Sequence, residues 1–355
     1  MRSLPMLIAL ALLVSCTKND HDVVVPPSEC LFLGKTSVAD APGSSVRTKL
    51  TSSTGVKFND QKQLLSSINV YKSEELDSNN AALVRRTETV QFDLSYDADG
   101  FLTKLIRRKV FLFEGIKAGT FLFEQYKFKN FRREDVETSD YKYESGHVAS
   151  STTQRQSTFL GNNVSLPVVE SSESKVYQYD GNGKPISAVT TATYGSAMTT
   201  FKNGVISSVL EKNLNGVVTI ETKYNEMGLV SSITNAQSVF EITYDARGNM
   251  TSVQSSTNGQ KAYITELFYD DHKNPENDIP KKFKGIPELI STAQRTDGVN
   301  NLIGDKTTLF PSNQVFETRT TYQYNSSGLP ESSAQTSAGA PEGSAITTTF
   351  NYKCP

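Results

Sequence analysis

The 355-residue sequence has no tryptophan, only three cysteines and only three histidines. His21, His147 and His272 stand far apart among turn-forming residues, so no histidine and cysteine cluster occurs at metal-ligand spacing. There is no glycine-rich phosphate loop and no Gly-x-Ser-x-Gly nucleophile elbow. We therefore assign no catalytic residue, no metal site and no cofactor, and expect a protein that is not an enzyme.

The sequence also lacks a long hydrophobic run. Its most apolar stretch, Leu4 to Val14, follows Arg2 and is too short to cross a bilayer as a helix. The residues that follow, Ser15 and Cys16, complete a pattern similar to the lipobox of bacterial lipoproteins. We predict that residues 1–16 are a signal peptide and that lipid on Cys16 anchors the protein to a membrane. The alternative is an ordinary cleaved signal with an incidental cysteine.

Residues 17–59 are rich in serine, threonine, proline and glycine, and we interpret them as a flexible tether. The polar run from Thr17 to Asp22 resembles the surface-export signals of Bacteroidota lipoproteins. This resemblance implies an outer-membrane lipoprotein displayed on the cell surface, with the periplasmic face as the other possible orientation.

Two cysteines remain after lipidation of Cys16. Cys30 and Cys354 lie near opposite ends of the mature chain, in a compartment that is oxidising after export. A disulfide between them is one reading, and two unpaired thiols are the other.

The chain is organised around short motifs in which an aromatic residue is followed by Asp or Asn and, three residues later, by glycine. Two neighbouring copies begin at Tyr224 and Tyr244, and Phe240, Ile242 and Tyr244 alternate with polar neighbours as in a half-buried strand. Asp or Asn accepts local backbone hydrogen bonds, and glycine supplies a positive φ, so each motif predicts a strand followed by a tight reversal. Further copies or variants begin at Tyr96, Tyr143, Tyr179, Phe201, Tyr269 and Tyr324.

These motifs resemble the YD repeat of Rhs-like bacterial surface proteins. The resemblance and the composition predict an all-β fold: an antiparallel hairpin meander that forms an elongated twisted sheet over residues 60–355. We expect an insertion near residues 274–310, where prolines interrupt the array, and short helices over residues 61–67 and 286–293. The pattern leaves open whether the sheet folds over on itself and closes.

The strand after each reversal has apolar residues three positions apart. Val230 and Ile233 form one such pair, and Met250 and Val253 form another. An odd interval places the two side chains on opposite faces of a strand unless a β-bulge lies between them. The sequence does not choose between these two arrangements.

The segment from Phe101 to Arg133 carries nine basic and two acidic residues, a net charge of +7 in a chain of net charge −2. Aromatic residues are interleaved with the basic ones, a combination that can bind anionic polymers. The candidate anionic-ligand patch is Arg107, Arg108, Lys109, Lys127, Lys129, Arg132 and Arg133. The alternative is a buried aromatic face backed by a solvated charged one.

The function predicted from these features is that of a non-enzymatic envelope lipoprotein, a structural or binding module that presents loops to an extracellular glycan or protein. Nucleic acid is not an expected partner. The alternative is a carbohydrate-active enzyme of an outer-membrane system, which requires a cleft lined by two carboxylates. The recurring Asp97, Asp180 and Asp245 do not favour it, because each occupies a turn position. A calcium ion on Asp270, Asp271 and Asn274 is a weaker possibility, since their spacing lacks the density of a calcium loop.

Overall fold

The computed structural model describes residues 31–41, 47–76, 82–115, 130–161, 164–165, 168–279, 282–288, 298–339 and 345–353. Its elements are β1 (Leu31–Ala41), β2 (Arg47–Phe58), β3 (Leu64–Leu76), β4 (Ala82–Tyr96), β5 (Leu102–Glu114), β6 (Phe131–Glu144), β7 (His147–Gly161), β8 (Val164–Ser165), β9 (Val169–Tyr179), β10 (Pro185–Ala192), β11 (Gly195–Lys202), β12 (Val205–Asn213), β13 (Val218–Tyr224), β14 (Val230–Asn235), β15 (Ser238–Tyr244), β16 (Met250–Thr257), β17 (Gln260–Lys273), the 3-10 helix η2 (Pro275–Asp278), β18 (Asn300–Leu309), β19 (Gln314–Tyr324), β20 (Pro330–Ser337) and β21 (Ile346–Lys353).

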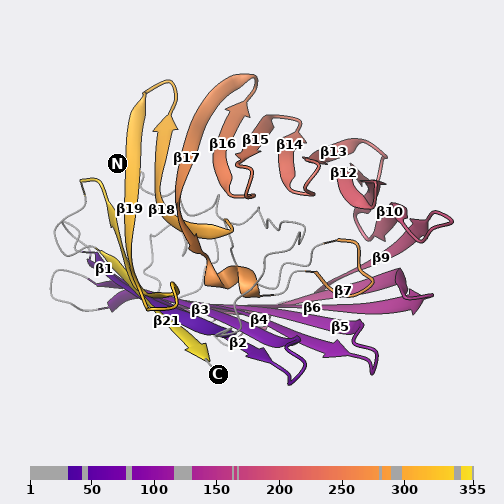
Figure 1. Ribbon diagram of the computed structural model, residues 1–355, viewed down its shortest axis with the longest axis horizontal. Coiled ribbons are helices and arrows are strands. Elements are labelled where there is room, and N and C mark those ends of the chain that lie inside the picture. Colours follow the sequence, from indigo (N-terminus) through magenta and orange to yellow (C-terminus); the bar gives the residue numbers. More distant parts are fainter. Residues whose placement is uncertain are drawn as a thin grey trace.

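These strands form one antiparallel sheet that closes on itself as a barrel (Figure 1). Each strand pairs with the next along the ring, and β1 pairs with both β2 and β21. The short β8 pairs with the end of β7 and is not part of the ring, because β7 pairs directly with β9 in it. The all-β antiparallel prediction is confirmed, but the predicted elongated sheet is wrong because its first and last strands meet.

Two further expectations, the extent of the tether and a short helix, are also wrong. Residues 31–41 and 47–58 were expected to belong to the tether, but they form β1 and β2 of the ring. The helix expected over residues 61–67 does not form, since β3 begins at Leu64. The predicted insertion is real but shorter than expected, because β18 begins at Asn300. Its described part runs between β17 and β18.

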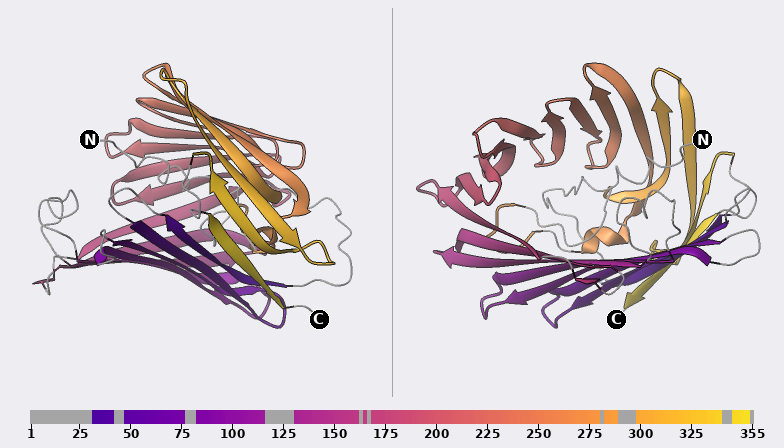
Figure 2. Two further views of the ribbon diagram at one scale, coloured as in Figure 1. Left: turned by 90° about the vertical axis from the view of Figure 1, so that its left-hand side faces the viewer. Right: turned by 180° about the vertical axis from the view of Figure 1, so that it is seen from behind.

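The reversals alternate between the two ends of the barrel (Figure 2). One end, which we call the tyrosine rim, carries the reversals that follow β2, β4, β6, β9, β11, β13, β15, β17 and β19. The other end, the opposite rim, carries the remaining reversals. β1 begins and β21 ends at the tyrosine rim, so both chain termini leave the described barrel from that side.

The predicted turn chemistry is present at the tyrosine rim. The Asp245 side chain accepts backbone hydrogen bonds from Arg247 and Asn249, at 2.9 and 2.8 Å. Gly248 has φ of 92°, a left-handed value that suits glycine. Equivalent pairs of hydrogen bonds are accepted by Asp97, Asp180, Asn225 and Asn325. One amide or carboxylate oxygen thus fixes each reversal.

A β-bulge after each reversal resolves the odd spacing of the apolar residues. Tyr244 pairs with Met250 while Thr243 pairs with Ser252, which leaves Thr251 as the extra residue. The side chains of Met250 and Val253 therefore both face inward, and both are buried. The same register shift opposite an aromatic residue occurs at Phe58, Tyr96, Tyr143, Tyr179, Phe201, Tyr224, Tyr269 and Tyr324.

The recurring tyrosines also link successive reversals. The Tyr244 hydroxyl donates to the carbonyl of Val230 at 2.9 Å, and Val230 is the first residue of the neighbouring strand. Matching bonds run from Tyr96 to Leu64, Tyr143 to Leu102, Tyr179 to Val148 and Tyr352 to Pro330. Each ring fills the inner side of the rim while its hydroxyl satisfies a carbonyl of the adjacent strand.

The inner and outer faces of the barrel differ in polarity. On β21, the inward Ile346, Phe350 and Tyr352 alternate with the exposed Thr347 and Thr349. On β4, Val90, Phe92 and Leu94 are buried and face inward. The residues of the outward face of the same strand are Arg85, Thr87, Thr89, Gln91, Asp93 and Ser95. Hydroxyl and charged side chains thus dominate these outward positions of β4 and β21. On β9, β10 and β11 the exposed Val176, Val189 and Met198 are register partners and form an apolar row on the outer face. No helix in the described part of the chain has the length and apolar character of a membrane span.

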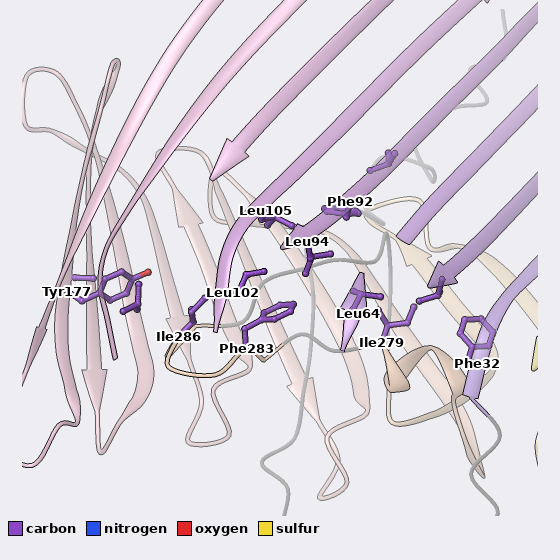
Figure 3. Close-up of a cluster of buried hydrophobic side chains, with 14 of the residues drawn as sticks. Phe32, Leu64, Phe92, Leu94, Leu102, Leu105, Tyr177, Ile279, Phe283 and Ile286 are labelled. Atoms are coloured by element: carbon purple, nitrogen blue, oxygen red, sulfur yellow. The ribbon is translucent and has the colours of Figure 1, made fainter. Parts of the chain in front are cut away.

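The chain between β17 and β18 turns into the barrel and fills part of its lumen. We call its described residues, 274–279 and 282–288, the lumen segment. Its Ile279, Phe283 and Ile286 are buried against inward side chains of the wall, as Figure 3 shows. Wall residues of this cluster include Phe32, Leu64, Phe92, Leu94, Leu102, Leu105 and Tyr177. Gly285 passes so close to the wall that a Cβ there would lie 2.7 Å from the Gly146 carbonyl oxygen.

We predict that Tyr244→Phe lowers the free energy of unfolding by about 0.5–1.5 kcal/mol, the net worth of one hydrogen bond, because the Val230 carbonyl loses its donor. Urea unfolding followed by circular dichroism measures the change. Tyr194→Phe is the matched control, since Tyr194 is 67% exposed. Equal effects of the two substitutions would show that the tyrosine rim does not depend on these hydroxyl groups.

We also predict a disulfide between Cys30 and Cys354, which both lie outside the described residues. Leu31 and Lys353 are register partners at the seam between β1 and β21, and each is covalently bonded to one of the cysteines. A bond there would cross-link almost the whole mature chain, a loop size for which the chain-entropy model gives a stabilisation of about 6 kcal/mol. Intact mass after alkylation, with and without reductant, detects it. Two alkylated thiols in the unreduced, exported protein would contradict this prediction.

Candidate functional site

The barrel lumen has an apolar zone and a polar zone. Along the inner face of β4, Leu94, Phe92 and Val90 lie on the side of the tyrosine rim, whereas Glu88 and Arg86 follow toward the opposite rim. The lumen segment packs on the apolar zone. The polar zone is therefore the part of the inner wall that remains for contacts with a ligand.

A cavity of about 780 Å³ lies in the lumen between the inner wall and the lumen segment. This is in the range of small-molecule pockets. Its wall comes from β6, β7 and β9 to β14, and its floor includes Ile286 and Glu288 of the lumen segment. Tyr194 and Gly195, in and next to the reversal between β10 and β11, also line it, so the cavity extends to the opposite rim.

Small side chains create the space. Ala192 and Ala197 face inward on β10 and β11. The register partner of Ala192 is Gly195, and those of Ala197 are Thr190 and Glu211. Gly195 admits no side chain, because a Cβ there would lie 2.1 Å from the Lys212 carbonyl oxygen. These residues leave a hollow where larger side chains would fill the lumen.

One guanidinium holds two carboxylates on the cavity wall. Arg155 of β7 donates from Nε to Glu137 at 2.7 Å and from Nη1 to Glu173 at 3.0 Å. Burial acts to lower the pKa of Arg155, but the two carboxylates outweigh it and raise that pKa. Glu137 of β6 is the register partner of Arg155, and Glu173 of β9 lies diagonally from it, two residues beyond the register partner Ser171, so the pairing cross-links the wall.

A second cluster joins the wall to the lumen segment. Glu288 accepts hydrogen bonds from the Lys175 ammonium and from the Tyr177 hydroxyl, the latter at 2.6 Å. Burial raises the pKa of Tyr177 far above its ordinary value, and the nearby Glu288 carboxylate raises it further. Tyr177 therefore stays a neutral hydrogen-bond donor, and Lys175 balances the charge of Glu288.

Glu211 of β12 is the cavity-lining carboxylate for which the described residues provide no cation. Its side chain is exposed, and its register partners are Ala197 and Ile220. Burial and the Glu288 carboxylate raise the pKa of Tyr224, and Glu211 adds a smaller contribution. The Glu211 carboxylate thus faces the hollow without a cation among the described residues.

The predicted basic patch does not form one surface. By register, Arg107, Lys109 and Arg133 face the lumen, whereas Arg108 and Arg132 face outward. Lys109 pairs with Glu88 at 2.9 Å, Arg133 with Asp135 at 2.8 Å, and both Arg108 and Arg132 with Glu134 at 3.3 and 2.8 Å. Arg107 lies over the Phe92 ring at 5.8 Å. The described part of this patch is therefore divided and largely neutralised. Lys127 and Lys129 lie outside the described residues.

The other predicted site residues have different outcomes. Cys16 lies outside the described residues, as do Cys30 and Cys354. Within the described part of the chain, no group of three His, Cys, Asp or Glu side chains could hold a metal ion. The oxygen atoms considered for calcium have other partners: Asp270 accepts from Tyr324 and Asn301, Asp271 pairs with Arg247, and Asn274 caps η2.

Sequence reasoning missed the cavity residues, although β9 carried a signal for them. Glu173 and Lys175 share the two-residue period of Tyr177 and of Tyr179, which begins one of the predicted reversal motifs. Charged residues in phase with buried aromatics indicate a polar zone on an inner face. The sequence did not indicate which strands and which part of the lumen segment would enclose these residues to form the cavity.

No protein-family model matches this chain, and no curated protein matches it either. Among solved structures it is similar to a porin-like protein from Bacteroides uniformis, with 9% identity and a TM-score of 0.36 over 91% of this chain and 96% of that one. It also matches a putative AttH from Nitrosomonas europaea, with 8% identity and a TM-score of 0.14 over 91% and 93% of the two chains. Both TM-scores are below 0.5, so neither likeness says anything about the function of this protein.

Proposed function

We propose that this protein is a non-enzymatic envelope lipoprotein whose barrel binds a small polar ligand in its lumen, with an extracellular glycan as the favoured class. The observation that carries the proposal is the cavity of about 780 Å³, lined by tyrosines, hydroxyl groups and ionised side chains. Barrels wider than their own side chains can fill commonly hold ligands in this way. The binding site is thus the inner wall rather than the basic hairpin.

The position of the chain termini supports an orientation for this module. The 14 residues between Cys16 and Leu31 can span at most about 50 Å, and they join the barrel at the tyrosine rim. A lipid on Cys16 then places the tyrosine rim toward the outer membrane and the opposite rim away from it. The cavity reaches that distal rim, where a ligand arrives from water.

The arrangement of charges favours binding over catalysis. A glycosidase needs one carboxyl group with a raised pKa to act as an acid, beside a second free carboxylate. In this cavity Glu137 and Glu173 both accept hydrogen bonds from Arg155, and Glu288 accepts from Lys175 and Tyr177. These three carboxylates are already engaged as hydrogen-bond acceptors in the wall, which favours a role in binding over one in acid–base chemistry.

The test compares two substitutions in the full mature chain, purified in detergent. Ala197→Phe places a large ring in the cavity, whereas Thr191→Phe places the same ring on the outer face of the neighbouring strand. Glycan-array binding and titration calorimetry with the array hits measure the effect. We expect Ala197→Phe to lower the affinity for the glycan at least about tenfold. The ring would displace the ligand from the cavity wall, and a loss of about 1.4 kcal/mol of binding free energy is enough for a tenfold change. Thr191→Phe should bind as the wild type does.

Two outcomes would overturn the proposal. Retention of every glycan hit in the folded Ala197→Phe variant would place binding outside the lumen. If the wild-type protein retains no neutral, basic or acidic saccharide, a glycan is ruled out as the ligand. Circular dichroism and urea unfolding of both variants show whether each has kept its fold.

A further inference from the structure

We propose that the lumen cavity selects ligands that carry an ammonium group, as amino sugars do, and that Glu211 is the residue that binds it. This inference rests on the proposed function of the cavity. It deepens that function by naming the chemical class of the ligand.

The balance of charge in the cavity is the first argument. Four glutamates line it: Glu137, Glu173, Glu211 and Glu288. Against them stand Arg155, Lys175 and Lys212, so the lining sums to −1. Lys212 follows Glu211 directly on β12, and adjacent strand residues point to opposite faces, which leaves a net charge of −2 on the inner face. A concave wall of one sign concentrates ligands of the other sign.

The occupancy of the charged groups is the second argument. Arg155 contacts two carboxylates and Lys175 contacts Glu288, so these two inward cations of the cavity lining already have anionic partners. An anionic ligand would have to compete with these pairs. Glu211 has no cation among the described residues, and an ammonium group that binds there displaces nothing.

The surroundings of Glu211 are the third argument. Its register partner Ala197 is small, so a ligand atom can approach the carboxylate from the side of β11. Its other register partner, Ile220 of β13, is apolar and offers no competing hydrogen-bond donor. Tyr194 at the distal rim, with 67% of its surface exposed, offers a flat face for a sugar ring. A carboxylate beside a small residue, in a cavity that also presents this aromatic face, fits an ammonium group on a polar ring.

Three probes of equal ring size but different charge test the inference: glucosamine, N-acetylglucosamine and glucuronate. Titration calorimetry on the full mature chain at low ionic strength measures each affinity. We expect glucosamine to bind most tightly, and Glu211→Gln to weaken glucosamine about tenfold, the order expected for loss of a hydrogen bond to a charged group. Added salt should weaken glucosamine more than N-acetylglucosamine, because ionic screening acts on the charged probe.

The control variant is Glu221→Gln, which removes a carboxylate from the outer face of β13 and should leave all three affinities unchanged. Equal affinity for glucosamine and N-acetylglucosamine, or an unchanged glucosamine affinity in Glu211→Gln, would overturn the ammonium site. If N-acetylglucosamine binds as tightly as glucosamine and Ala197→Phe abolishes the binding of both, the lumen site stands while its preference for cations falls. If no saccharide binds at all, the proposed function itself fails.

Discussion

The structure depends on the pairing of β1 with β21. Residues 31–38 of the first strand meet residues 347–353 of the last, and this contact turns a meander into a ring. Closure satisfies the backbone groups of two strands that would otherwise be exposed edges, which are prone to aggregation. It also creates an inside. Inward residues such as Phe92 in the apolar zone and Glu211 in the cavity are enclosed because this pairing closes the ring.

A ring of this size encloses more space than its own side chains can fill, since eight strands already make a barrel just wide enough for packing. The protein meets this constraint in two ways. At the tyrosine rim, the lumen segment supplies Ile279, Phe283 and Ile286 and forms a continuous core with the wall. Beside β10 and β11, small residues leave the space empty, and charged groups line it. The packed apolar zone stabilises the barrel, and the cavity exposes charged side chains that can contact a ligand.

The two regions are joined by Glu288, which belongs to the lumen segment and bonds to Lys175 and Tyr177 of the wall. Tyr177 belongs to the apolar cluster through its ring and to the cavity through its hydroxyl. The position of the cavity floor therefore follows from the packing of the apolar zone. This coupling explains why a hydrophobic core and a polar site share one lumen without a separating layer.

The sequence by itself determined the local structure at the tyrosine rim. Asp245, Gly248 and Tyr244 lie within five residues of one another, and their side-chain geometry and backbone freedom specify a strand end and a reversal wherever they occur. Only the tertiary structure decided the bulge that turns Val253 inward, the closure of the ring, and the division of Arg107 and Arg108 between two faces. The bulge depends on the register within one hairpin, which the residue pattern left open. Closure depends on contacts between residues far apart in the chain, such as Thr36 and Thr349, and it decides which face of each strand is the inside. Local residue patterns carry no record of which distant strand will pair.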